Sequence, residues 1–73
     1  MVEIDINLPP LVFKYRNWEG ETAVRRAIPI RVWYGHTEWH PVDGWLMTAW
    51  DTDKDAERTF SMPDILEINP KEV

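Results

Sequence analysis

Basic and aromatic side chains are the residues of this sequence with the clearest capacity for chemistry. Residues 13–34 carry five basic side chains against two acidic ones, a local charge of +3 in a chain whose net charge is −5. Guanidinium groups bind phosphate and carboxylate oxygens, and indole rings stack on nucleobases or pack against a protein partner. The candidate ligand-binding residues are Arg16, Arg26, Arg31, Trp33, Trp50 and Arg58. The competing interpretation is that these charges lie on solvated strand faces and balance acidic residues elsewhere.

Arg58 is the strongest single candidate for a ligand-binding residue. It precedes Phe60 by two residues, so both side chains lie on the same side of a strand. We expect Phe60 to face the core. Arg58 must then leave at the end of the barrel and bind an anion, or pair with an acid such as Asp51 or Asp64. The sequence leaves the anion site and the structural salt bridge open.

Neither a metal site nor a catalytic centre is indicated. His36 and His40 lack a third fixed ligand, and the acidic segment from Asp51 has Ala56 and Met62 where a calcium-binding loop needs glycine and glutamate. The chain contains no cysteine, and no serine or threonine stands in the glycine-framed setting of a nucleophile elbow. We therefore expect a protein that is not an enzyme and that uses no cofactor and no metal.

The elements that must position the basic and aromatic residues are short strands. A chain of 73 residues is one domain, and strands are predicted at residues 11–16, 21–34, 44–51 and 58–61, separated by turn residues. Pro29 cannot donate to a ladder and predicts a bulge, a bend or an edge. Pro63 and Asp64 favour a helical turn within residues 62–67. The pattern predicts an all-β, partly open barrel of four to five antiparallel strands with one short C-terminal helical turn.

The strand at residues 44–51 is the richest in large apolar side chains. Trp45, Met47 and Ala49 share one face, which we assign to the core. Trp50 lies on the opposite face, where it would be a recognition residue exposed to solvent or covered by a partner, unless residues 1–10 fold over it and bury it. Trp18 and Trp33 are expected to be exposed for the same reason, since so small a barrel has only one interior.

An ordered series of residues runs through most of the chain. Its members are Phe13-Lys14-Tyr15-Arg16, Gly20, Arg26, Pro29, Trp45-Leu46-Met47, Ala49, Asp51, Arg58, Phe60 and Asp64-Ile65. In order and spacing these residues resemble the WYL domain, a sensor module often attached to bacterial transcription regulators. The resemblance covers roughly residues 11–66. It implies an SH3-like or Sm-like barrel at residues 11–68, preceded by an extension at residues 1–10 and followed by a tail at residues 69–73.

Two departures from the family separate this chain from a complete regulator. Leu46 stands where the family signature has tyrosine, so the hydrogen bond of that hydroxyl is lost. No helix-turn-helix precedes the domain, so we expect it to act with a separate DNA-binding protein. The family's ligand role rests on basic side chains in a positively charged groove, which only the arginines of this chain can supply.

Two functional classes follow. The first is a regulatory module of the WYL kind that binds an anionic ligand, namely a nucleotide or single-stranded nucleic acid. The second is a structural or adaptor protein that associates with a protein partner, or with itself as a homodimer, through its edge strands and exposed tryptophans. No apolar stretch approaches the ~18 residues of a membrane span, so we expect no membrane partner. The first twelve residues lack the basic segment that opens a secretory signal peptide, so we expect a cytoplasmic location.

Overall fold

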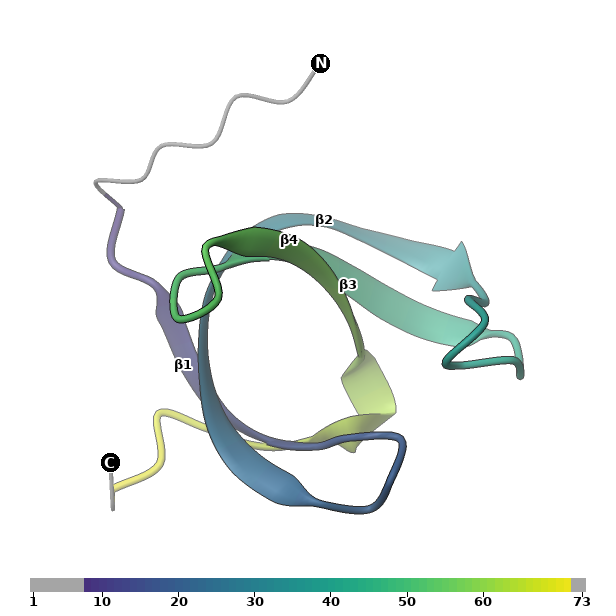
Figure 1. Cartoon of the computed structure of the whole chain (residues 1–73), viewed down its shortest axis with the longest axis horizontal. Helices are drawn as coiled ribbons and strands as arrows, with labels where there is room; N and C mark the ends of the chain where they lie inside the picture. Colours follow the sequence, from purple (N-terminus) through teal and green to yellow (C-terminus); the bar gives the residue numbers. More distant parts are fainter. Residues whose placement is uncertain (1–7, 72–73) are drawn as a thin grey trace.

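A computed structural model describes residues 8–71, which form a single antiparallel sheet. Most of the predicted N-terminal extension and the last two residues of the predicted tail lie outside this described part. The sheet contains five strands, with one 3₁₀ turn between the fourth and the fifth (Figure 1). The elements are β1 (Leu11–Arg16), β2 (Thr22–Gly35), β3 (Gly44–Asp51), β4 (Ala56–Ser61), η1 (Met62–Asp64) and β5 (Ile65–Ile68).

The strands follow the order β4-β3-β2-β1-β5 and curve into a ring that does not close (Figure 1). The edge strands β4 and β5 do not pair with each other; η1 spans the gap between them. The predicted all-β fold, a partly open barrel with one short helical turn, is therefore confirmed. Ile65 and the three residues after it differ from the prediction in one detail, because they pair with β1 as a strand instead of completing a helical turn.

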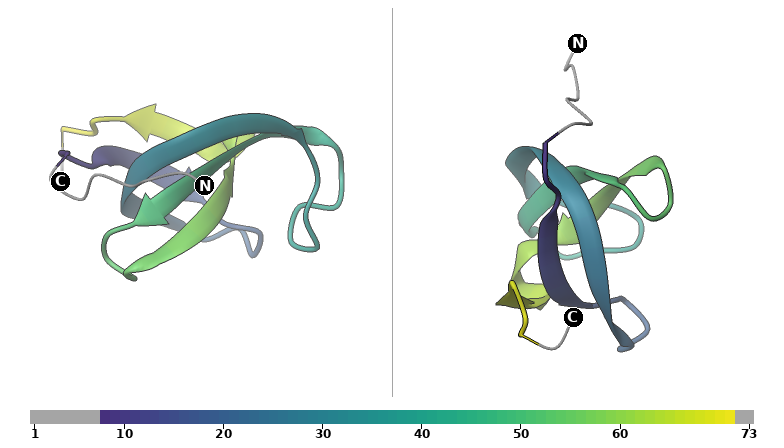
Figure 2. Two further views of the ribbon diagram at one scale, coloured as in Figure 1. Left: turned by 90° about the horizontal axis from the view of Figure 1, so that it is seen from above. Right: turned by 90° about the vertical axis from the view of Figure 1, so that its left-hand side faces the viewer.

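β2 is long because it belongs to two strand pairs. Its first half pairs with β1 through Ala27, and its second half pairs with β3 from Ala27 to Gly35. The register with β3 shifts between Pro29 and Arg31, so Pro29 marks a bulge as predicted. Beyond this bend the ends of β2 and β3 project away from the ring (Figures 1 and 2). We call this part, residues 30–46, the projecting hairpin.

Three aromatic rings fill the interior of the barrel. Phe13, Tyr15 and Phe60 are each at most 4% exposed and meet edge to face, with ring centroids 5.0–6.2 Å apart. Such pairs are each worth about 0.5–1.5 kcal/mol beyond the apolar area that they bury. Met47 and Ala49 of β3 complete the buried cluster, as predicted.

The prediction that Trp45 fills the core is wrong. Trp45 shares the inner face of β3 with Met47 and Ala49, but it lies on the projecting hairpin, where no opposite wall faces it. Its side chain is 55% exposed and meets the Tyr34 ring edge to face, at 5.4 Å between ring centroids. The assignment of Trp45 to the inner face of β3 was correct. The error was the assumption that β3 lies inside the barrel along its whole length.

The opposite face of β3 is covered, which also corrects the prediction. Leu46 and Thr48 are buried and Trp50 is half-buried. Trp33 of the projecting hairpin is likewise half-buried, and its indole N–H donates to Oγ1 of Thr48 at 2.9 Å. Gly35 makes room for this ring, because a Cβ there would lie 2.7 Å from Cζ3 of Trp33. The sheet thus buries side chains on both faces near its middle.

Candidate functional site

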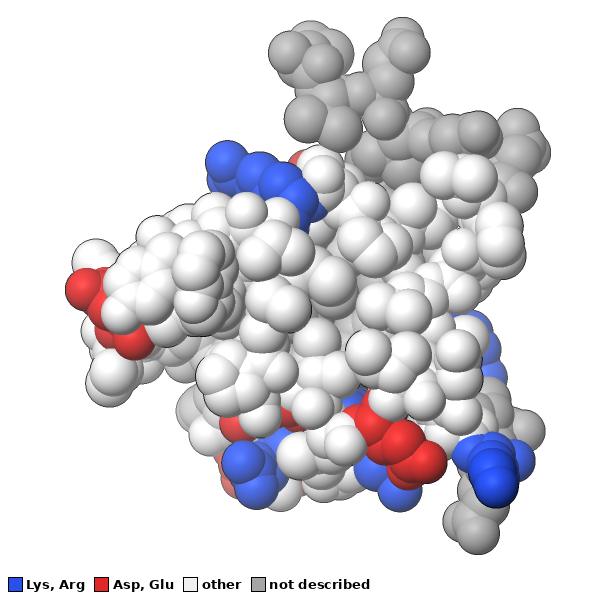
Figure 3. Space-filling model, turned by 180° about the vertical axis from the view of Figure 1, so that it is seen from behind, with Lys and Arg blue, Asp and Glu red and all other residues white. Residues whose placement is uncertain are grey.

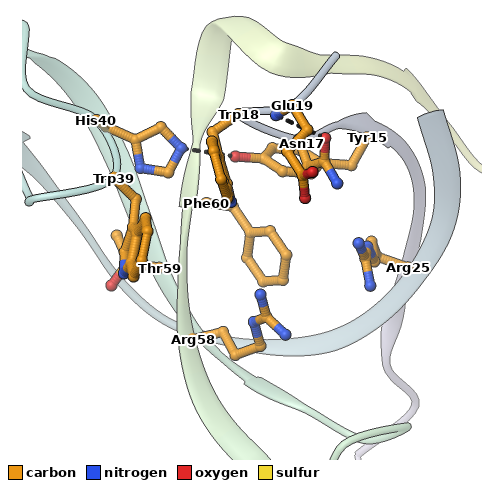
Figure 4. Close-up of a pocket in the computed structure, with 10 residues that line it drawn as sticks. All are labelled: Tyr15, Asn17, Trp18, Glu19, Arg25, Trp39, His40, Arg58, Thr59 and Phe60. Atoms are coloured by element: carbon orange, nitrogen blue, oxygen red, sulfur yellow. Dashed lines mark hydrogen bonds between the residues drawn. The ribbon is translucent and has the colours of Figure 1, made fainter. Parts of the chain in front are cut away.

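A cavity of about 360 Å³ opens at one end of the barrel. Four segments form it: the end of β1 with the β1–β2 turn, the first half of β2, the loop between β2 and β3, and β4. The lining residues are Tyr15, Asn17, Trp18, Glu19, Arg25, Trp39, His40, Arg58, Thr59 and Phe60 (Figure 4). The volume lies within the range of small-molecule sites.

The β1–β2 turn is built by a single asparagine. The side-chain oxygen of Asn17 accepts the backbone N–H groups of Glu19 and Glu21, each at 2.9 Å. Gly20 supplies the left-handed conformation with a φ of 84°. This turn places the indole of Trp18 against Trp39 of the next loop, with centroids 5.4 Å apart and planes tilted by 31°. Both indoles remain more than half exposed, so each offers a free surface for stacking.

The loop at residues 36–43 is fastened to the barrel by Tyr15. The hydroxyl of Tyr15 accepts the backbone N–H of Ser61 at 2.8 Å and lies 3.2 Å from Nε2 of His40 (Figure 4). A neutral imidazole with its proton on Nδ1 satisfies both neighbours, because Nε2 then accepts from Tyr15 and Nδ1 faces Oγ1 of Thr37 at 3.3 Å. Burial raises the pKa of the Tyr15 hydroxyl above its ordinary value of 10.0. Tyr15 therefore stays protonated at neutral pH and can donate to His40.

Two arginines provide the positive charge of the cavity. Arg25 comes from β2 and Arg58 from β4, and both guanidinium groups point into the space around Phe60 (Figure 4). Within residues 8–71 neither forms an ion pair with a carboxylate. Nε of Arg25 is shielded from solvent and has no hydrogen-bond partner there. A buried donor without a partner is costly, and an anion entering the cavity would satisfy it.

Arg58 is therefore the predicted ligand-binding residue that lies in the cavity, on the same side as Phe60 as expected. The alternative, a salt bridge from Arg58 to Asp51 or Asp64, is not formed in the described part of the chain. Asp51 instead stabilises the β3–β4 turn, because its Oδ1 accepts the backbone N–H groups of Asp53 and Lys54 at 3.0 and 3.1 Å.

The other predicted arginines of the first two strands lie elsewhere. Arg16 pairs with Asp64 at 3.2 Å and lines a neighbouring, more open cavity beside Trp18. Arg26 points to the opposite face of β2 from Arg25 and pairs with Asp53 at 3.6 Å. Both charges are already balanced by carboxylates.

Arg31, Trp33 and Trp50 form a different group. The guanidinium carbon of Arg31 lies 5.4 Å from the centre of the Trp33 ring, a cation–π contact. All three residues lie on the outer face of the sheet, where Arg31 is exposed and both rings are half-buried. The structure thus does not bring them together with Arg58.

Arg25, Tyr15, Trp18, Trp39 and His40 line the cavity but are missing from the predicted set. A signal for Arg25 was present, because its odd number places it on the same face as the alternating residues 23 and 27 of β2. The pairing of Trp18 with Trp39 had no such signal, since it joins two loops whose approach depends on the bend of β2. Among residues 8–71 no cluster of three metal-ligating side chains exists.

Comparisons with protein-family models, with curated proteins and with solved structures find no match for this chain. The fold and the cavity define a small all-β domain with a basic, aromatic-lined site. Across residues 8–71 the structure contains no helix of the length and apolarity that crossing a membrane requires.

Proposed function

We propose that this protein is a non-enzymatic regulatory module that binds a small anionic ligand with a planar ring, such as a nucleotide or the end of a single-stranded nucleic acid. One observation carries the proposal. Arg25 and Arg58 enter the same cavity without a carboxylate partner among the described residues, and Nε of Arg25 is buried and unsatisfied. Arg25 and Arg58 bring two positive charges to a small cavity that one carboxylate, Glu19, also lines, and this surplus of positive charge favours an anion.

The aromatic lining favours a ligand with a ring beside its charge. Trp18 and Trp39 border the cavity and keep more than half of their surface accessible. Base–indole stacking is worth about 1–3 kcal/mol per base and tolerates any sequence. A phosphate held between Arg25 and Arg58, with the base against Trp18 or Trp39, uses both features at once.

The resemblance to WYL domains supports the same class of function. That family's ligand role depends on basic side chains in a positively charged groove, and Arg58 belongs to the matching series of residues. The case for Arg25 as an anion-binding residue rests on the geometry of the cavity alone. With no helix-turn-helix in residues 8–71, a regulatory effect on DNA would pass through a separate protein.

Amide-resolved NMR titration tests the proposal. The probes are the four ribonucleoside monophosphates, with inorganic phosphate as the charge-only probe and the nucleosides as the ring-only probes. We expect saturable shifts at Trp18, Arg25, Trp39 and Arg58 for a monophosphate, and weaker binding of either half-ligand. Arg25→Gln and Arg58→Gln should each weaken binding at least about tenfold, because hydrogen bonds to charged groups are worth about 1.5–3 kcal/mol.

Arg31→Gln is the matched control. It removes the same charge from a site outside the cavity and should leave the affinity unchanged. If no probe gives saturable shifts at low ionic strength, or if the shifts map to Arg31 and Trp33, the cavity is not the ligand site.

Protein association is the second candidate function. The projecting hairpin exposes Tyr34 and Trp45, which are 60% and 55% accessible. In the view of Figure 3 the hairpin lies at the left, where a broad uncharged surface is bordered by acidic and basic atoms. Exposed aromatic pairs of this kind are common at the centre of protein interfaces. Sedimentation equilibrium across concentration tests self-association, and a strict monomer would leave only a foreign partner.

A further inference from the structure

The second half of β2 has an open edge. β1 pairs with β2 only at residues 22–27, so along residues 31–35 the side of β2 that faces away from β3 pairs with no strand of the described chain. We call residues 31–35 the open edge. Val32 and Tyr34 of this edge have 52% and 60% of their surfaces accessible. An unpaired edge that carries exposed apolar side chains is a template for pairing with another strand.

The two ends of the open edge differ in charge. Arg31 at one end is exposed and has no carboxylate partner among residues 8–71. At the other end, the carboxylate of Asp43 contacts Nδ1 of His36, the residue that follows the edge, at 2.8 Å. With the imidazole neutral, this end keeps the full negative charge of Asp43. A strand that pairs with the edge is therefore favoured if it brings a negative charge to Arg31 and a positive charge to Asp43.

A second copy of the same edge brings these charges when it runs antiparallel. The open edge is centred on Trp33, so a two-fold axis at that residue sets Trp33 opposite its own copy and Arg31 opposite Gly35 of the second copy. Within one strand, Arg31 and His36 are five positions or about 17 Å apart, which exceeds the screening length of about 8–10 Å. Across the axis the same two positions are only about 6 Å apart, because paired strands are about 4.8 Å apart.

The same pairing joins the apolar rows of the two hairpins. Directly opposed residues of an antiparallel pair share a face. With Trp33 opposite its copy, Val32 of each chain lies opposite Tyr34 of the other, and Trp45 extends the row from β3. Val32, Tyr34 and Trp45 are each more than half exposed in the single chain. Strand direction, charge and apolar surface therefore select the same occupant, which is a second copy of this chain.

We propose that this protein forms a two-fold dimer in which the open edges of two projecting hairpins pair antiparallel about Trp33 and join the two sheets into one. The proposal rests on the second candidate function, protein association through the projecting hairpin, and names the partner. None of residues 31–35 lines the cavity of Arg25 and Arg58, so the dimer does not depend on what that cavity binds.

Sedimentation equilibrium at protein concentrations up to about 1 mM measures the dimer. We expect a reversible monomer–dimer equilibrium for the wild type. Arg31→Glu should raise the dimer dissociation constant at least about tenfold, because the two-fold axis places the reversed charge near Asp43 at both ends of the interface. Arg31→Glu combined with Asp43→Arg exchanges the two charges and should restore association to near the wild-type level.

Lys54→Glu is the matched control for the charge reversal. Lys54 is exposed in the β3–β4 turn, outside the projecting hairpin, and its substitution changes the net charge by the same amount as Arg31→Glu. The dissociation constant of the dimer should therefore stay unchanged. A loss of association equal to that of Arg31→Glu would show that net charge controls the dimer, and it would overturn the proposed pairing.

Isotope-filtered NMR on a mixture of labelled and unlabelled wild-type chains locates the interface without any variant. We expect proton contacts between Val32 of one chain and Tyr34 of the other. A strict monomer at the highest concentration would overturn the proposal, while association of the hairpin with a foreign protein would still stand. A dimer whose intermolecular contacts map to β4 or β5, or a charge exchange that fails to restore association, would also overturn it.

Discussion

Replacing Tyr15 by phenylalanine separates the role of the hydroxyl from that of the ring. The ring keeps its edge contacts with Phe13 and Phe60. Removal of the hydroxyl removes the hydrogen bond from the Ser61 N–H and the contact with His40. Each such bond contributes about 0.5–1.5 kcal/mol net, so we expect Tyr15→Phe to lower the free energy of unfolding by about 1–3 kcal/mol. A domain of this size has a free energy of unfolding of about 3–5 kcal/mol, so the variant should remain largely folded but with little stability left.

The effect of Tyr15→Phe should also depend on pH. Burial raises the pKa of Tyr15 in the folded protein above 10.0, while the unfolded chain keeps the ordinary value. Below the unfolded pKa both states hold the proton, and the full stabilisation is present. As the pH rises past about 10 the unfolded chain ionises first, which favours unfolding. The advantage of wild type over Tyr15→Phe should therefore be constant from pH 7 to 9 and shrink above pH 10.

Urea unfolding followed by tryptophan fluorescence measures both quantities. Tyr34→Phe is the matched control, because the Tyr34 ring is 60% exposed and its hydroxyl makes no hydrogen bond within residues 8–71; it should change stability by less than about 0.5 kcal/mol. Equal losses for the two variants would show that Tyr15 is not the fastening point of the loop. A wild-type advantage that persists unchanged to pH 11 would contradict the raised pKa.

Two further variants test the packing. Phe60→Ala should lower the free energy of unfolding by about 3–5 kcal/mol and unfold most of the protein, whereas Trp45→Ala should lower it by less than about 2 kcal/mol because the ring is 55% exposed. Amide spectra of the two variants distinguish these outcomes. A larger loss of stability for Trp45→Ala than for Phe60→Ala would place Trp45 in the core. Asp51→Ala should cost about 1–3 kcal/mol by removing the acceptor of two turn N–H groups, and thermal unfolding that matches the wild type would show that the turn forms without it.

Local patterns in the sequence were enough to place most of the fold. The alternation of residue types predicted strands at residues 11–16 and 44–51, and Pro29 predicted a bulge at the correct position. Strand periodicity is a property of neighbouring residues, so it is readable without knowing what packs above them. The same periodicity could not say how far along its length β3 stays inside the barrel, and the prediction for Trp45 failed for that reason.

The amino-acid sequence by itself determined the all-β class, the four principal strands and the sharing of a face by Arg58 and Phe60. Only the tertiary structure decided which arginines meet. Arg25 and Arg58 are 33 positions apart and enter one cavity because β2 bends and the sheet curls, while Arg26, one residue further on, points to the opposite face and pairs with Asp53. The physical reason is that a strand's pattern sets the direction of a side chain locally, whereas the distance between two strands that do not pair depends on the accumulated bend and twist of everything between them.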